Sequence, residues 1–264
     1  MKDNLWTIKA LWIGERLSLI EQVSLASFVK NGHKVELFTY GKVQNIPEGV
    51  IVRDANEILA ENKIYKYKKK PSYAGFANWF RYLMLYKEGG VWIDTDVVCL
   101  KPFDFDTDLF FGKEQFDKVN CAVVGAKPGL EIFNFLANQV ENPNDFLPYD
   151  TTREKRRKLF RKYIEGNKRG NVKWGETGPI GFTKALEHFG LFEKHKLPMT
   201  AFYPIHSTCW DNIFDETFPT PEPYFPDTYA IHLWNEMMRR EDGFSKDATY
   251  SENSLIECLK RRYL

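Results

Sequence analysis

The chain has 264 residues, enough for one large domain or for one domain with an added lobe. Its 37 basic and 36 acidic residues nearly cancel, so the overall charge gives no support for nucleic acid as a partner. The four cysteines form no C-x-x-C pair, which argues against a zinc site and fits a reducing, cytoplasmic compartment. The N-terminal apolar stretch is short and is broken by Lys9, so we expect neither a signal peptide nor a membrane span.

The first part of the chain predicts alternating strands and helices. Apolar or alternating runs predict strands, and apolar residues at helical spacing predict helices. The predicted elements are, in chain order, strand 5–13, helix 17–30, strand 33–40, strand 50–53 and helix 56–61. This order predicts an α/β fold with a mostly parallel sheet sandwiched by helices.

The end of the first strand is a candidate nucleotide site. Ligands of such sheets bind beyond the carboxyl ends of the strands, and Trp12, Ile13 and Gly14 lie at one such end. A nucleotide base could stack on Trp12, and Gly14 would let the backbone approach it closely. The alternative is that Trp12 is an ordinary core residue.

The next predicted helix covers residues 72–87. Asn78 and Arg81 are three residues apart in it and therefore share a face. Arg81 could pair with a nearby carboxylate as a structural ion pair, and this role does not exclude contact with a ligand.

Residues 82–102 finish this helix, break at Gly89-Gly90, and continue as a strand that holds Asp94 and Asp96. Side chains alternate along a strand, so both carboxylates would point to one face, roughly 7 Å apart. Apolar neighbours on both sides predict a buried strand, where two like charges are costly unless a cation or strong donors neutralise them. Carboxylate oxygens suit Mg²⁺ or Mn²⁺, which also bind phosphate oxygens. A chance D-x-D triplet on a solvated loop is the alternative, and the apolar flanks argue against it.

The second half of the chain predicts further strands, helices and turns. The predicted elements are strands 110–111 and 120–126, helix 130–140, a strongly basic helix 153–162, a short strand 229–234 and helix 254–264. With Leu159 and Phe160, the basic helix could be an amphipathic helix that touches anionic lipid or a lipid-diphosphate acceptor; a solvated helix is equally consistent.

A Gly- and Pro-rich stretch, residues 173–183, predicts a tight turn whose backbone N–H groups could grip sugar hydroxyls. Glu176 lies just before Gly178-Pro179 in this turn. A carboxylate there could stabilise oxocarbenium charge or orient an acceptor.

Residues 72–100, with an arginine in the helix, Gly-Gly and D-T-D, resemble the core motif of bacterial family-32 glycosyltransferases, the DXD sugar transferases of capsule and lipopolysaccharide clusters. Thr177-Gly178-Pro179 and His232-Leu233-Trp234-Asn235 resemble later elements of that family, in the right order. The resemblance implies a single GT-A type domain over residues 1–264. Residues 1–130 would be the nucleotide-sugar and metal-binding half, and 131–264 a helical and loop acceptor half.

The resemblance also implies roles for single residues. The turn at Trp12 would meet the base, and Asn78 stands where the family commonly has an Asp that contacts ribose or the donor sugar. Arg81 would contact donor hydroxyls or the metal-site Asp, and His232 would be a third metal ligand or a diphosphate contact. The predicted metal ligands are Asp94, Asp96 and His232, and the predicted catalytic residues are Asp94, Asp96 and Glu176. The predicted donor-binding residues are Trp12, Ile13, Asn78, Arg81, Thr95, Gly178, Pro179, Trp234 and Asn235.

The implied function is that of a retaining, Mn²⁺- or Mg²⁺-dependent glycosyltransferase. It would move a UDP-linked hexose or N-acetylhexosamine to an oligosaccharide or lipid-linked saccharide acceptor of capsular polysaccharide or lipopolysaccharide. We expect it in the cytoplasm or peripherally on the cytoplasmic face of the inner membrane. One alternative is a nucleotidyltransferase or phosphotransferase, for which the sequence lacks a G-x-x-x-x-G-K loop. The other is a non-catalytic sugar-nucleotide-binding protein, against which the intact D-T-D argues.

Overall fold

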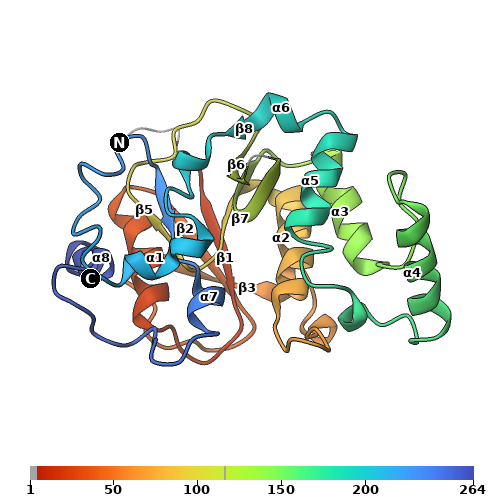
Figure 1. Ribbon diagram of the computed structural model, residues 1–264, viewed down its shortest axis with the longest axis horizontal. Coiled ribbons are helices and arrows are strands. Elements are labelled where there is room, and N and C mark those ends of the chain that lie inside the picture. The colour runs from red at the N-terminus through yellow and green to blue at the C-terminus, as the bar shows by residue number, and fades with distance from the viewer. Residues whose placement is uncertain (1–4, 116) are drawn as a thin grey trace.

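The computed structural model describes residues 5–115 and 117–264, which form a mixed α/β structure (Figure 1). Its main sheet has seven strands in the order β3-β2-β1-β4-β7-β6-β8. The first four strands in this order run parallel to one another, and β7 is antiparallel to both of its neighbours. The strands are β1 (Ile8–Trp12), β2 (Val35–Thr39), β3 (Val50–Asp54), β4 (Gly90–Ile93), β6 (Leu109–Gln115), β7 (Lys118–Ala126) and β8 (Lys196–Leu197). The prediction of a mostly parallel sheet is confirmed.

Helices cover both faces of this sheet because successive strand side chains point to opposite sides. Val91 and Ile93 belong to the core on the side of α1 (Leu19–Lys30) and α8 (Leu255–Tyr263). Trp92, between them, belongs to the core on the opposite side. The helices of that side are α2 (Ala74–Glu88), α3 (Glu131–Glu141) and α5 (Pro179–His188). Figure 1 shows the two groups of helices on either side of the strands, which confirms the predicted sandwich.

The predicted strand through Asp94 and Asp96 is wrong in one respect. Strand β4 ends at Ile93, and the chain turns through Asp94, Thr95 and Asp96 before β5 (Val97–Cys99) begins. The N–H of Val97 closes this turn on the carbonyl of Asp94, at 3.1 Å. Strand β5 leaves the main sheet and pairs antiparallel with β9 (Ala230–His232), with Val97 opposite His232. The turn therefore brings both carboxylates to the end of the sheet beside a residue from the far end of the chain.

The prediction of a helix over residues 56–61 is also wrong. The structure has a short 3-10 helix there, Ala55–Glu57. The carboxylate of Asp54 accepts the N–H of Asn56, at 2.8 Å, and so tightens the chain into a local turn. The remaining helices are α4 (Thr152–Tyr163), α6 (Phe192–His195) and α7 (Asn235–Met238). The 3-10 segments of the described chain are Ala55–Glu57, Glu61–Lys63, Arg169–Asn171, Met199–Ala201 and Ser207–Ile213.

Among the described residues, no helix is long and apolar enough to cross a membrane.

The packing of β7 against β6 predicts a strong effect of one added methyl group. A Cβ at Gly125 would lie 2.1 Å from the ring of Phe110, which is buried. We expect Gly125→Ala to lower the free energy of unfolding by roughly 1–3 kcal/mol, because a close-packed core resists added volume. Urea unfolding measures this.

Gly41→Ala is the matched control, since a Cβ there meets no atom within 4 Å. We expect it to change the free energy of unfolding by less than about 0.5 kcal/mol. Equal stabilities of the two variants would contradict this view of the sheet packing.

Candidate metal centre

Three side chains meet at the end of the main sheet. One ligand atom from each of Asp94, Asp96 and His232 lies within 4.8 Å of the others. The two carboxylates come from the turn after β4, and the imidazole comes from the last residue of β9. The structure therefore brings together the three predicted metal ligands.

Asp94 is held from one side. The guanidinium of Arg81 donates to its Oδ1 at 2.8 Å, and the indole N–H of Trp92 donates to the same oxygen at 2.7 Å. Arg81 is buried and lies over the ring of Trp92, whereas 36% of the Asp94 side chain is exposed. One oxygen of Asp94 is thus fixed by protein donors, and the side chain still reaches solvent.

Asp96 is buried and is held by the C-terminal segment. Its Oδ2 accepts the backbone N–H of Asn235 at 2.8 Å, and its Oδ1 lies 3.3 Å from Nε2 of His232. Burial by itself raises the pKa of Asp96, but the charge and hydrogen bond of His232, together with the N–H of Asn235, hold this pKa below its usual range. The close pair of acids thus depends on positive charge nearby.

His232 shows the same dependence from the other partner. Burial lowers its pKa, but the charge and hydrogen bond of Asp96, followed by the charge of Asp94, raise this pKa above its usual value. The proton on His232 and a cation would neutralise the same two carboxylates. Histidine binds a metal only through a neutral imidazole, so protonation of His232 and binding of a metal ion would compete.

Buried polar atoms without partners gather at this end of the sheet. Among the described residues, six buried side-chain nitrogens or oxygens have no hydrogen-bond partner. Four of them belong to predicted site residues, namely Trp12 Nε1, Arg81 Nε, His232 Nδ1 and Asn235 Oδ1. An unpaired buried polar group is costly, so these atoms point to a polar ligand. Two carboxylates and an imidazole, with unpaired polar atoms around them, fit Mn²⁺ or Mg²⁺ carrying phosphate oxygens.

Asn78 and Gly178 form the side of the site next to α2. The carboxamide oxygen of Asn78 accepts from Arg81 at 2.7 Å, so Asn78 helps to fix the arginine that binds Asp94. A Cβ on Gly178 would lie 2.9 Å from the Asn78 amide nitrogen, so this close approach requires glycine. Pro179 is the first residue of α5. The predicted turn at Gly178-Pro179 is therefore in contact with the predicted donor face of α2.

Trp234 and Thr95 contribute to the shape of the metal centre. The indole N–H of Trp234 donates to the carbonyl of Ile205 at 2.9 Å, and its ring lies 4.3 Å from that of His232. Trp234 is buried and packs against the imidazole, and its predicted contact with the donor stays a prediction. Thr95 is half-buried in the turn between the two acids, and Ile13 is half-buried just after β1.

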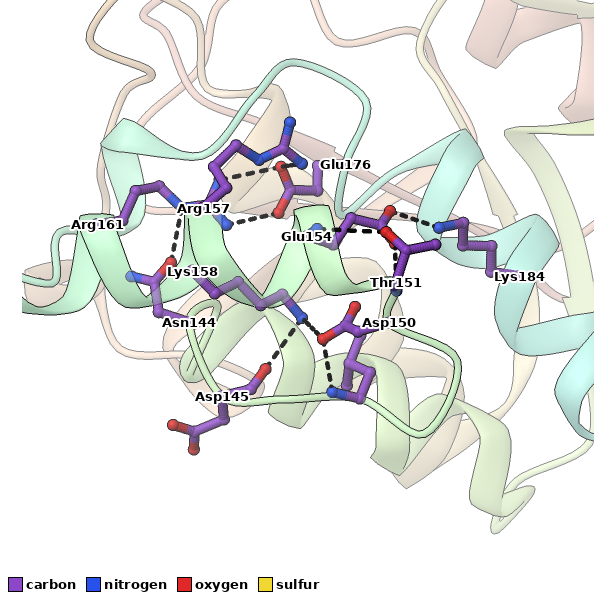
Figure 2. Close-up of polar contacts among 11 residues, drawn as sticks. Asn144, Asp145, Asp150, Thr151, Glu154, Arg157, Lys158, Arg161, Glu176 and Lys184 are labelled. Atoms are coloured by element: carbon purple, nitrogen blue, oxygen red, sulfur yellow. Dashed lines mark hydrogen bonds and ion pairs between the residues drawn. The ribbon is translucent and has the colours of Figure 1, made fainter.

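Glu176 lies apart from the three ligands. Its carboxylate accepts from Arg161 at 2.7 and 3.0 Å and from Arg157 at 3.0 Å. Figure 2 shows it facing both arginines of α4. The structure does not include it in the metal group, and its catalytic role stays a prediction.

Lys246 and Glu21 lie beside the predicted site residues Trp12 and Asn235, and no sequence pattern indicated either of them. The amine of Lys246 lies 5.7 Å from the centre of the Trp12 ring and forms an ion pair with Glu21, which is fully buried. Lys246 also contributes to the lowered pKa of Asp96. It lies in a polar segment without a recognisable motif, and only the fold places it over Trp12.

Comparison with known proteins agrees with this geometry. Residues 21–117 match the family model described as the glycosyltransferase sugar-binding region containing the DXD motif. Residues 170–263 match the one described as the alpha 1,4-glycosyltransferase conserved region. Both halves of the chain thus match glycosyltransferase regions. The first match holds Asp94 and Asp96, and the second holds His232.

Curated relatives and solved structures carry related descriptions. Human alpha-1,4-N-acetylglucosaminyltransferase is 23% identical over 80% of this chain and 58% of its own length. Human lactosylceramide 4-alpha-galactosyltransferase is 25% identical over 69% of this chain and 46% of its own length. The chain thus spans about half the length of these relatives. The PaToxG glycosyltransferase structure has a TM-score of 0.44 at 18% identity, with 71% of each chain covered. The UDP-bound glycosyltransferase domain of the YGT toxin has 0.41 at 12% identity, covering 97% of this chain and 82% of that one.

Replacing one buried acid should weaken binding of a divalent cation. Mn²⁺ should raise the melting temperature of the native protein, because a ligand that binds only the folded state stabilises it. In Asp96→Asn we expect Mn²⁺ affinity to fall at least about tenfold, since a charged ligand is lost. Calorimetric titration with Mn²⁺ measures the affinity directly.

Asp106→Asn is the control, because Asp106 is an exposed acid outside the group. It should bind Mn²⁺ like the native protein. Equal affinities for all three proteins would show that Asp96 is not a ligand.

Proposed function

We propose that the protein is a metal-dependent, retaining glycosyltransferase that uses a nucleotide diphosphate sugar as donor. The observation that carries the proposal is the meeting of Asp94, Asp96 and His232 among unpaired buried polar atoms, inside the regions that match glycosyltransferase models. Mn²⁺ or Mg²⁺ held by these three residues would neutralise the charge that grows on the departing diphosphate.

The residues that would surround the metal ion and the donor diphosphate have separate roles. Arg81 holds Asp94 in place, and the N–H of Asn235 holds Asp96. Lys246 pairs with Glu21 and places its amine beside Trp12, from where the amine could bind a donor phosphate instead. Trp12, half-buried at the end of β1, offers its ring to a base.

We propose a UDP-linked hexose or N-acetylhexosamine as the donor and an oligosaccharide or lipid-linked saccharide as the acceptor. The names of two relatives support this choice, since one is an N-acetylglucosaminyltransferase and the other a galactosyltransferase acting on lactosylceramide. Asn78 can hydrogen-bond a sugar or ribose hydroxyl, although its carboxamide is already engaged by Arg81. Roles in bacterial capsule or lipopolysaccharide synthesis, membership of family 32 and a cytoplasmic location remain parts of this proposal.

Retention would follow attack of the acceptor on the face that the diphosphate leaves. In that route a phosphate oxygen takes the acceptor proton, so the protein needs no carboxylate nucleophile at the sugar. The engagement of Glu176 by two arginines fits this route, because that carboxylate is already neutralised.

The products distinguish the proposal from a nucleotidyltransferase. With Mn²⁺ and a UDP-sugar, we expect release of UDP, through transfer or slow hydrolysis, and none of pyrophosphate or UMP. A chelator should stop this release. A thermal-shift screen of UDP, GDP and CMP sugars, with and without Mn²⁺, identifies the nucleotide.

Replacing Asp94 should remove activity while the fold persists. We expect Asp94→Asn to lower the rate of UDP release at least about a hundredfold, because one charged ligand of the cation that would neutralise the departing diphosphate is lost. The amide keeps an acceptor for Arg81 and Trp92, so circular dichroism should be unchanged. UDP formation at native rates in a folded Asp94→Asn protein would exclude the proposed role.

Lys246 should affect donor binding more than the chemical step. We expect Lys246→Met to raise the KM for the nucleotide sugar about tenfold, because one charge-assisted hydrogen bond to phosphate is lost. Lys246→Arg should restore most of the binding.

The single change removes the ion pair of Glu21, a buried acid, and the double variant Glu21→Gln/Lys246→Met controls for this loss. Its KM should stay raised even where its melting temperature recovers. A native KM in the double variant would show that Lys246 serves only to neutralise Glu21.

A further inference from the structure

Helix α4 turns two of its charged side chains inward and its large apolar side chains outward. Lys158 and Arg161 are buried, whereas Phe160 is 54% exposed and Tyr163 74% exposed. A helix on a globular protein normally does the reverse. In Figure 1, α4 lies at the edge of the molecule, on the far side of α3 from the sheet.

The inner face is held by ion pairs and hydrogen bonds. Lys158 donates to a carboxylate oxygen of Asp150 at 2.7 Å, and both side chains are 4% exposed. Arg161 donates to Asn144 at 2.7 Å and to Glu176. Figure 2 shows Arg161 reaching Glu176 and Asn144, and Lys158 reaching Asp150. The spacing 154, 158, 161 places the buried or half-buried charged residues on one helical face, so the opposite face must point outward.

Exposed apolar side chains gather on the outer face of α4 and in the residues next to this helix. Its members, exposed by 42–74%, are Phe146, Leu159, Phe160, Tyr163 and Ile164. These are five of the twelve exposed large hydrophobic residues in the described parts of the chain, and they fall within a stretch of 19 residues. Such a cluster on the surface marks a binding face. We call these five residues the α4 apolar face.

Cations surround the α4 apolar face. Arg153, Lys155 and Arg156 are exposed, and none of them forms an ion pair within the described residues. Lys155 lies over the ring of Phe146, at 5.8 Å. Glu154, the one acid in the helix, is taken up by Lys184 at 2.6 Å and by the helix cap. The outward charge of α4 is therefore positive.

We propose that the α4 apolar face docks on an anionic lipid bilayer. An amphipathic helix with Leu, Phe and Tyr between Lys and Arg residues can lie in the headgroup region, with the apolar side chains inserted and the cations against anionic headgroups. A protein partner would need an apolar surface bordered by acidic residues. An anionic membrane offers an apolar interior and negatively charged headgroups together.

The docked helix would also be connected to the metal centre. Glu176 pairs with Arg157 and Arg161 of α4 and lies two residues before Gly178, which contacts Asn78. Docking would thus hold the turn that borders the donor face of α2 close to the membrane surface. Lipid binding does not require transfer activity, so it can succeed or fail independently of the proposed function.

Flotation with vesicles tests the proposal on the full chain. The native protein should float with vesicles of equal parts phosphatidylcholine and phosphatidylglycerol, and should not float with phosphatidylcholine alone. Arg153→Glu/Arg156→Glu should weaken binding at least about twentyfold, because each cation contributes about fivefold. Phe160→Ser/Tyr163→Ser should weaken it at least about tenfold, through lost apolar insertion.

Two matched controls have the same changes elsewhere on the surface. Lys42→Glu/Lys118→Glu reverses two exposed charges, and Tyr224→Ser/Leu264→Ser removes two exposed apolar side chains. Both should float like the native protein. Absence of native binding to anionic vesicles, or equal losses in controls and α4 variants, would overturn the proposal. So would a native dimer in sedimentation that Phe160→Ser/Tyr163→Ser dissociates, since a second copy would then cover the face.

Discussion

Two carboxylates placed within a few ångströms of each other are the constraint on which this structure depends. Asp94 and Asp96 lie together because the chain turns between β4 and β5, and each is held by donors from a different part of the fold. Helix α2 supplies Arg81, and the end of β9 and the start of α7 supply His232 and the N–H of Asn235. The strand order and the C-terminal segment therefore bring hydrogen-bond donors and positive groups next to the two carboxylates, at a site that could bind a cation.

The sequence predicted well wherever a local pattern determines the structure. Apolar periodicity gave the strands and helices on both sides of the sheet, and the D-x-D triplet with its apolar flanks gave the acids of the metal centre. The triplet was wrongly predicted to lie inside a strand, because the apolar residues before Asp94 and after Asp96 suggest one continuous strand. The turn between them is required only by the pairing of β5 with β9. Lys246 was missed because its role depends on Glu21, which is 225 residues away in the chain.

Helix α4 shows a second limit of pattern reading. The sequence predicts a basic helix that is either amphipathic or solvated, but it cannot say which face is buried. Asp150 and Glu176 decide this, since the buried carboxylate of Asp150 pairs with Lys158 and the half-buried carboxylate of Glu176 pairs with Arg161. The apolar side chains are then left outside, next to unpaired cations. Because Glu176 also lies beside the Gly178 turn, the same ion pairs join this outer helix to the metal end of the sheet.

Pulsed electron–nuclear double resonance of Mn²⁺ bound with UDP tests most directly whether Asp94, Asp96 and His232 hold a cation on a nucleotide diphosphate. We predict a ³¹P coupling from directly bound phosphate and a ¹⁴N coupling from His232 in the native protein. The ¹⁴N coupling should disappear in His232→Ala, and both couplings should disappear in Asp96→Asn. A spectrum of hydrated Mn²⁺ that the protein leaves unchanged, or ³¹P coupling that survives in Asp96→Asn at native affinity, would contradict a metal centre at these residues.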